Sequence, residues 1–166
     1  MLNREPLRQV SQDDIENYHR DGAGCLRQVL HQDWIDSLLP AAKKIVVDKE
    51  EVGLLPNLPG RYMARCVKEF RRFVFESPVA EVAGQVMRSK EIRFFFDEIF
   101  AKAPKSNEKT IWHTDRMGWP VTGHMVPSIW IPLHSITKQN SLECIAGSQT
   151  QDVRYWLFSP NARHMI

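Results

Sequence analysis

The hydrophobic pattern of the chain changes its period about halfway along, and this change restricts the fold more than any other feature. In the first half, apolar residues recur every three to four positions, as they do on one face of a helix. In the second half they form short runs rich in Phe, Ile and Val, which are typical of strands. Helices followed by strands within 166 residues predict an α+β fold around one sheet core.

Three amphipathic helices are predicted in the first half. Ser11 is a candidate N-cap with Asp14 at the third helical position, and two glycines end this helix. Asp33 is a candidate cap for a second helix, which Pro40 should kink or interrupt. The third helix is predicted to follow Ser77-Pro78, a cap and a proline at the first helical position.

Strands are predicted in four segments, which are 25–29, 92–101, 126–133 and 142–146. The second of these is typical of a strand buried on both faces, so we expect Phe94 and Phe96 in the core. Pro127 and Pro132 confine the third segment to an edge or a bulge of the sheet. The stretch from Gly53 to Gly60 is predicted to be a loop.

Composition excludes several classes of protein. Hydrophobic residues make up 43% and charged residues 25%, which argues against intrinsic disorder. A net charge of +2 gives no argument for a nucleic-acid partner. Neither a transmembrane run nor a signal peptide is evident, so we expect a single cytoplasmic domain spanning residues 1–166 that does not bind membranes. An odd number of scattered cysteines suits buried free thiols rather than disulfides or zinc; they are Cys25, Cys66 and Cys144.

The candidate chemistry lies in Trp112-His113-Thr114-Asp115. A His-x-Asp pair at the end of a strand points both side chains to one face. An imidazole and a carboxylate there form two corners of the 2-His-1-carboxylate triad of non-haem Fe(II) enzymes. The spacing alone is not specific, because His31-Gln32-Asp33 repeats it where capping of a helix is a sufficient explanation.

The order of short motifs around this pair is more specific than the pair itself. The motifs are Tyr18, Asp21-Gly22 and 25–29 near the start, Lys102-Ala103-Pro104 before the pair, and Trp119-Pro120, Trp130, Asn140-Ser141-Leu142 and Gly147-Ser148-Gln149 after it. Over roughly residues 11 to 150 the sequence resembles the phytanoyl-CoA dioxygenase family, a branch of the Fe(II)/2-oxoglutarate oxygenases. Two positions depart from the family pattern, since Ser141 replaces a turn glycine and Gln149 replaces a histidine.

The resemblance implies a fold and a reaction. The fold would be a double-stranded β-helix (jelly-roll, cupin-like) core backed by the N-terminal helices. His113 and Asp115 would hold Fe(II), while Lys102, Trp130 and Thr114 would bind the co-substrate 2-oxoglutarate. O₂ would be the oxidant, ascorbate would keep the iron reduced, and a small organic substrate would be hydroxylated. Lys102 as a solvated strand-end residue and Trp130 as a core aromatic are the alternatives.

The family places a second ligand histidine, and an arginine that grips 2-oxoglutarate, in a C-terminal half of the jelly roll. This chain stops at Ile166, so we expect a jelly roll that is incomplete at its C-terminus and does not turn over 2-oxoglutarate alone. His164 is the one alternative third ligand. The rival functions are a cupin-like metal-binding module without a redox cycle and a non-catalytic scaffold. The scaffold reading follows from the unpaired strand edges of a half jelly roll, which would seek a partner, so a homo-oligomer through such an edge is expected.

Overall fold

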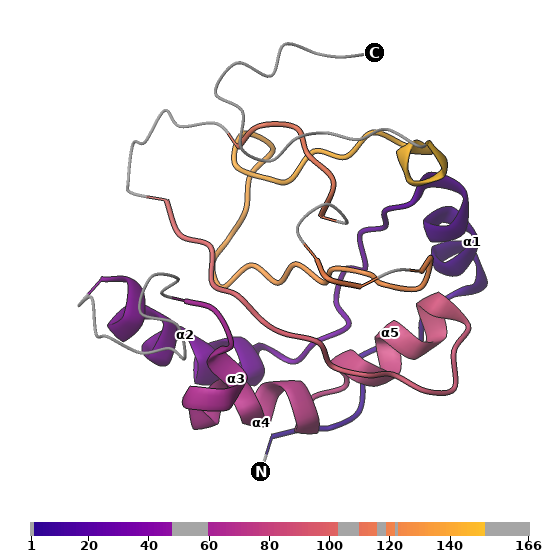
Figure 1. Cartoon of the computed structure of the whole chain (residues 1–166). Coiled ribbons are helices and arrows are strands. Elements are labelled where there is room, and N and C mark those ends of the chain that lie inside the picture. The colour runs from indigo at the N-terminus through magenta and orange to yellow at the C-terminus, as the bar shows by residue number, and fades with distance from the viewer. Residues whose placement is uncertain (1, 48–59, 103–109, 116–118, 122, 152–166) are drawn as a thin grey trace.

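The computed structural model describes residues 2–47, 60–102, 110–115, 119–121 and 123–151. Its elements are α1 (Gln12–Asp21), α2 (Gln32–Val46), α3 (Met63–Cys66), α4 (Lys68–Glu76), α5 (Val79–Met87) and the short 3₁₀ helix η2 (Ser148–Thr150). Helices α2 to α5 gather on one side of the molecule, and irregular chain from the second half forms the other side (Figure 1). Helix α1 lies between the two sides, with η2 next to its end (Figure 1).

The core forms where α2 and α3 both pack against α4, and buried residues of all three helices belong to one cluster. The buried face of α2 carries Trp34, Leu38, Ala42 and Ile45, so the helical spacing seen in the sequence is confirmed. The rings of Trp34 and Phe73 meet edge to face at 5.8 Å between centroids. The indole N–H of Trp34 donates to a backbone carbonyl at 2.7 Å, which satisfies its one polar atom inside the core.

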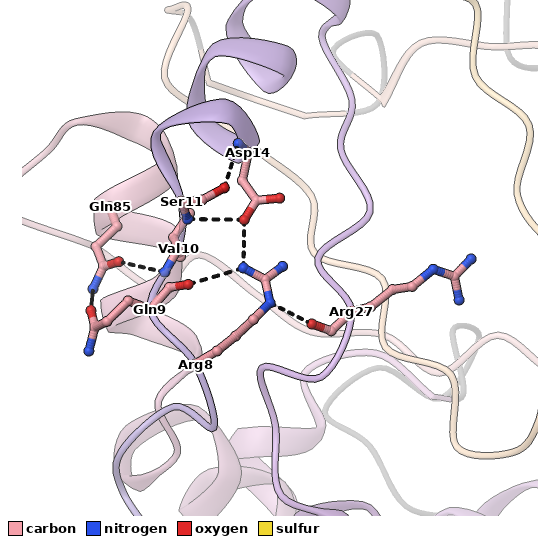
Figure 2. Close-up of polar contacts among 7 residues, drawn as sticks. All are labelled: Arg8, Gln9, Val10, Ser11, Asp14, Arg27 and Gln85. Atoms are coloured by element: carbon pink, nitrogen blue, oxygen red, sulfur yellow. Dashed lines mark hydrogen bonds and ion pairs between the residues drawn. The ribbon is translucent and has the colours of Figure 1, made fainter.

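Helix α1 begins with the predicted capping box, shown in Figure 2. The Ser11 hydroxyl accepts a hydrogen bond from the Asp14 backbone N–H at 3.1 Å, and the Asp14 carboxylate accepts one from the Ser11 N–H at 3.0 Å. The same carboxylate pairs with the Arg8 guanidinium at 2.6 Å. Arg8 also donates to the carbonyl of Arg27 at 2.9 Å, so this cap fastens the N-terminal segment to the chain beyond α1.

The other two predicted helices are present, with corrected starts. His31, and not Asp33, occupies the N-cap of α2 and makes no side-chain cap bond. Asp33 lies in the first turn, where its charge favours the positive end of the helix dipole. Helix α2 continues through Pro40. The proline removes only one N–H donor, and the buried residues before and after it hold the helix in place. Pro78 is the N-cap of α5, and the Ser77 hydroxyl accepts from the first N–H of that helix at 3.3 Å.

The predicted β-sheet is not found in the described residues, and this overturns the α+β, double-stranded β-helix fold class. The one β pairing in these residues is an antiparallel bridge between Arg61 and Glu98. The segment 92–101 therefore has only a short partner, and Phe94 is 39% exposed while Phe96 is half-buried. The physical reason is that residues with high β-propensity form a strand only beside a partner on a shared surface. The described residues are instead helices packed against irregular chain.

The remaining predicted strands are also irregular in this structure; they are 25–29, 126–133 and 142–146. Gln28 has a left-handed backbone (φ 56°), which breaks the first of them. Pro127 and Pro132 lack the N–H groups that a ladder needs. Leu142 is 59% exposed, so the last segment has no core to face. The predicted loop from Gly53 to Gly60 lies, apart from Gly60, outside the described residues.

The surface differs from expectation at the cysteines. All three are free, as predicted, but they are exposed rather than buried, and none belongs to the buried core cluster, although Cys66 is the last residue of α3. The homo-oligomer was expected to form through an unpaired sheet edge. The described ranges contain no sheet and therefore no such edge, so the homo-oligomer stays a prediction. Within these ranges no helix has the length and apolar character needed to cross a membrane.

Candidate metal centre

His113 and Asp115 lie close together on the irregular segment 110–115. Nε2 of His113 is 3.4 Å from Oδ1 of Asp115. The side chains are 30% and 46% exposed, so both are open to solvent. Two donor atoms in adjacent positions on one ion lie about 3 Å apart when each bond to the metal is about 2.1 Å. The observed separation is close to this spacing.

Within the part of the chain that the structure describes, hydrogen bonds to neighbouring groups leave one donor atom on each side chain without a hydrogen-bond partner. Nδ1 of His113 is 2.7 Å from the carbonyl oxygen of Ile111, which can only accept, so Nδ1 carries the proton. In the neutral ring Nε2 then has an open lone pair. The Ser128 hydroxyl donates to Oδ2 of Asp115 at 2.5 Å, and Oδ1 accepts no hydrogen bond from the described residues. With the ring protonated, the 3.4 Å approach is an ion pair; with the ring neutral, Nε2 and Oδ1 are both available to one metal ion, so the pair also fits a metal.

The pair supplies two of the three protein ligands of a facial triad. No group of three or more His, Cys, Asp or Glu side chains placed to hold a metal occurs in the part of the chain that the structure describes. His164, the alternative third ligand, lies outside that part. The second His-x-Asp pair is placed differently, since Nε2 of His31 is 2.7 Å from the Asn3 side-chain nitrogen and Asp33 lies in the first turn of α2.

The predicted 2-oxoglutarate contacts are placed unequally around the pair. Thr114 is half-buried and lines a cavity together with His113. Lys102 donates from Nζ to the Thr110 hydroxyl at 2.9 Å, and so it contacts the segment that leads to the histidine. Trp130 is 41% exposed. Neither Lys102 nor Trp130 lines that cavity. The proposed 2-oxoglutarate contacts of all three residues stay predictions.

The cavity beside His113 has a volume of about 180 Å³. Its walls come from three parts of the chain, and the lining residues include Asp21, Gly22, Trp112, His113, Thr114, Glu143 and Cys144. Asp115 is not among the lining residues, so the cavity lies on the histidine side of the pair. The Asp21-Gly22 turn, one of the motifs in the sequence, therefore forms a wall next to the candidate ligand.

The segment that carries η2 docks onto the C-terminal end of α1 and closes this wall. Nε2 of Gln149 donates to the carbonyls of His19 at 3.3 Å and Arg20 at 3.2 Å, and the Gly147 N–H donates to a third carbonyl at 2.8 Å. Gly22 has φ +75°, and a Cβ there would collide with the Gln149 amide. Gln149, a departure from the family pattern, thus caps the end of α1.

Sequence reasoning missed the residues that orient and enclose the pair. Ser128 lies in a segment that was predicted to be a strand, and nothing in the sequence marks it as a partner of Asp115. The docking of Gln149 was also missed, although two flexible glycines, Gly22 and Gly147, mark both sides of the junction. Glu143 and Cys144 carried no motif.

A histidine and a carboxylate with facing free donor atoms are typical of metal-dependent enzymes. A family model described as phytanoyl-CoA dioxygenase (PhyH) matches residues 18–161, which is most of the chain. The chain therefore belongs to the phytanoyl-CoA dioxygenase family, and the resemblance seen in its motifs is confirmed. This family is a branch of the Fe(II)/2-oxoglutarate oxygenases, so the chain is of the oxygenase kind. No curated protein and no solved structure matches it significantly.

Proposed function

We propose that this protein is an Fe(II)- and 2-oxoglutarate-dependent dioxygenase that hydroxylates a small organic substrate, with His113 and Asp115 as two of its iron ligands. The supporting observation is the 3.4 Å approach of Nε2 and Oδ1, two donor atoms that make no other hydrogen bond with the described residues. Membership of the oxygenase family supports the choice of iron and 2-oxoglutarate. When bound, these two groups would use O₂ to place one oxygen atom in a C–H bond of the substrate and the other in succinate, with release of CO₂.

The residues of the chain bind and orient in this proposal. The bond from Nδ1 of His113 to the Ile111 carbonyl fixes the tautomer that presents Nε2. The bond from Ser128 holds Asp115 with Oδ1 toward the histidine. Thr114 and Lys102 are proposed to donate hydrogen bonds to 2-oxoglutarate, and Trp130 is proposed to pack against it. Each of these three roles is separate from the holding of the metal.

Anaerobic titration of Fe(II) into the purified protein tests the ligand pair. His113→Ala and Asp115→Ala should each lose stoichiometric iron binding, since every ligand adds coordination energy directly. Ser128→Ala should weaken binding about 10–100-fold, as the loss of a hydrogen bond to a ligand typically does. His31→Ala is the matched control, because it alters the other His-x-Asp pair, and it should bind iron normally. Stoichiometric iron in Asp115→Ala would remove the basis of the proposal.

Turnover is a separate measurement. The expectation that these 166 residues alone do not turn over 2-oxoglutarate stays a prediction, and succinate formed in the presence of Fe(II), ascorbate and 2-oxoglutarate tests it. Turnover that is abolished by His164→Ala would instead make His164 the third ligand. Iron binding by a longer form of the protein without any succinate would favour a metal-binding module that lacks a redox cycle.

A further inference from the structure

Two exposed aromatic rings lie side by side where α4 meets the segment 92–101. Phe75, in the last turn of α4, is 61% exposed, and Phe94 is 39% exposed. Their ring centroids are 6.0 Å apart. Single exposed apolar side chains are ordinary, but rings in contact form a continuous apolar patch. The other face of α4 carries Phe70 and Phe73 into the core, so the helix that presents Phe75 is fixed in place.

Further rings continue this patch toward α3. Phe96 is two residues after Phe94, so their Cα atoms are at most about 7 Å apart. The Phe96 ring lies 5.7 Å from the ring of Tyr62, the residue that precedes α3. These rings form one aromatic row, from the end of α4 to the start of α3; its members are Phe75, Phe94, Phe96 and Tyr62.

An arginine lies over the ring at each end of the aromatic row. The Arg71 guanidinium is 5.1 Å from the centre of the Phe75 ring. The Arg65 guanidinium is 5.3 Å from the centre of the Tyr62 ring. Neither arginine makes an ion pair with the residues that the structure describes. A guanidinium stacked on a ring keeps N–H groups at its edge, and these can bind a carboxylate through two hydrogen bonds.

The two helices that carry these arginines have an excess of positive charge. Residues 63–76 contain two acidic side chains and four cationic ones, which are Arg65, Lys68, Arg71 and Arg72. Both acids already have a partner. Glu69 is 3.9 Å from Lys68, and Glu76 is 3.3 Å from Arg72. The surface therefore favours a ligand that brings its own carboxylates.

The same features disfavour three other occupants. A second copy of the chain in a two-fold contact would bring like charges together, because the same patch would face itself. A membrane surface would need an apolar helix face, and that of α4 is already in the core. A nucleic acid carries a regular row of phosphates, and the whole chain has a net charge of only +2.

We propose that the aromatic row binds an acidic peptide segment of a partner protein, with an apolar side chain of the peptide on Phe75 and Phe94. Carboxylates of the peptide pair with Arg71 and Arg65 at the two ends of the row. Aromatic and arginine side chains are the residues that contribute most to protein interfaces. None of these four residues lines the cavity beside His113, so the proposal is independent of the oxygenase function.

Fluorescence anisotropy with the fluorescein-labelled peptide Glu-Leu-Glu-Glu-Phe-Leu-Glu tests this surface. One control peptide has Gln in place of every Glu, and a second has Ser in place of every Leu and Phe. Each control should bind about tenfold more weakly, because it lacks either the charges or the apolar side chains. Raising the ionic strength to about 0.5 M should weaken binding of the acidic peptide several-fold.

Variants of the protein locate the binding surface. Arg71→Gln and Phe75→Ala should each weaken binding of the acidic peptide about fivefold. Arg27→Gln and Leu142→Ala are matched controls, because both residues are exposed and lie outside α3, α4 and the segment 92–101. They should bind the peptide normally. Urea unfolding shows whether Phe75→Ala is folded, and its exposure predicts a stability close to that of the unsubstituted protein.

Equal binding of the acidic and Gln peptides would overturn the proposal, as would no binding of the acidic peptide or equal losses in the control variants. Phosphatidylserine vesicles and a single-stranded oligonucleotide test the other anionic partners. If either binds through Arg71 and Phe75 while the acidic peptide does not, the partner belongs to another class and the proposal is wrong. Iron binding should be unchanged in Arg71→Gln, so failure of the peptide would leave the proposed metal centre intact.

Discussion

Replacement of Asp14 by Asn should destabilise the protein at neutral pH and have almost no effect at pH 2. The Arg8 guanidinium, together with the Ser11 N–H, lowers the pKa of Asp14 from 3.8 to about 2. This difference corresponds to about 2.4 kcal/mol in favour of the folded state. The side chain is 21% exposed, and screening by water reduces the contribution to about 1–2 kcal/mol.

The direction follows from the lowered pKa. A carboxyl group whose folded pKa lies below its unfolded value stabilises the protein fully above pH 3.8, and this stabilisation is lost as the pH falls through about 2. The assay is urea unfolding, followed by tryptophan fluorescence at several pH values between 7 and 2. Asp14→Asn should show a free energy of unfolding about 1–2 kcal/mol lower at pH 7, and the two curves should converge at the acid end.

Asp13→Asn is the matched control for this experiment. Asp13 lies in the same first turn of α1 but makes no ion pair with the described residues. It should therefore cost no more than about 0.5 kcal/mol, the usual contribution of a carboxylate near a helix N-terminus. Equal costs for the two variants, or a gap for Asp14→Asn that persists at pH 2, would refute the reasoning from the Arg8 pair.

Two further predictions concern the α1 junction and the core. Gly22→Ala should cost about 1–2 kcal/mol for its left-handed backbone, and more for the displaced Gln149. Gln149→Ala alone should lower the free energy of unfolding by about 1 kcal/mol. In a double-mutant cycle, the double variant should lose less stability than the sum of the two single losses. Fully additive costs would mean that the two residues are not in contact. Phe73→Ala should cost about 3–5 kcal/mol in urea unfolding because its ring is buried against Trp34. Phe94→Ala should cost about 1 kcal/mol or less because its ring is 39% exposed, and a larger cost would place it in a core after all.

The helical half of the fold could be predicted because its signals are local. A capping box needs only Ser11 and Asp14, three residues apart, and the buried face of α2 follows one helical period from Trp34. The strand-like half could not be predicted in the same way. The residues of 92–101 have a high β-propensity, but whether they form a strand depends on partner segments from elsewhere in the chain.

The candidate site shows the same division. The sequence proposes His113 and Asp115 from two residues and the motif order, and the structure adds that Nε2 and Oδ1 lie 3.4 Å apart; their role as ligands stays a prediction. Their supports come from distant segments, as with Ser128, and no local pattern marks such a partner. The departure at Ser141 has a simple explanation, because Asn140 closes the preceding turn through its side chain and Ser141 does not have a positive φ.

The junction between Gln149 and the end of α1 also determines when the cavity can form. Its hydrogen bonds join residues that are 130 and 129 positions apart, the longest separations among the side-chain hydrogen bonds of the described residues. Closing such a loop lowers the conformational entropy of the chain before its contacts stabilise the closed form. We therefore expect this docking to follow the formation of the helices during folding. The same bonds lie at the exposed surface, and they should open well before the core does. Amide hydrogen exchange at Gly147 should therefore be faster than within α2. Access to the cavity would then follow the opening of this one contact, while the helical core stays folded.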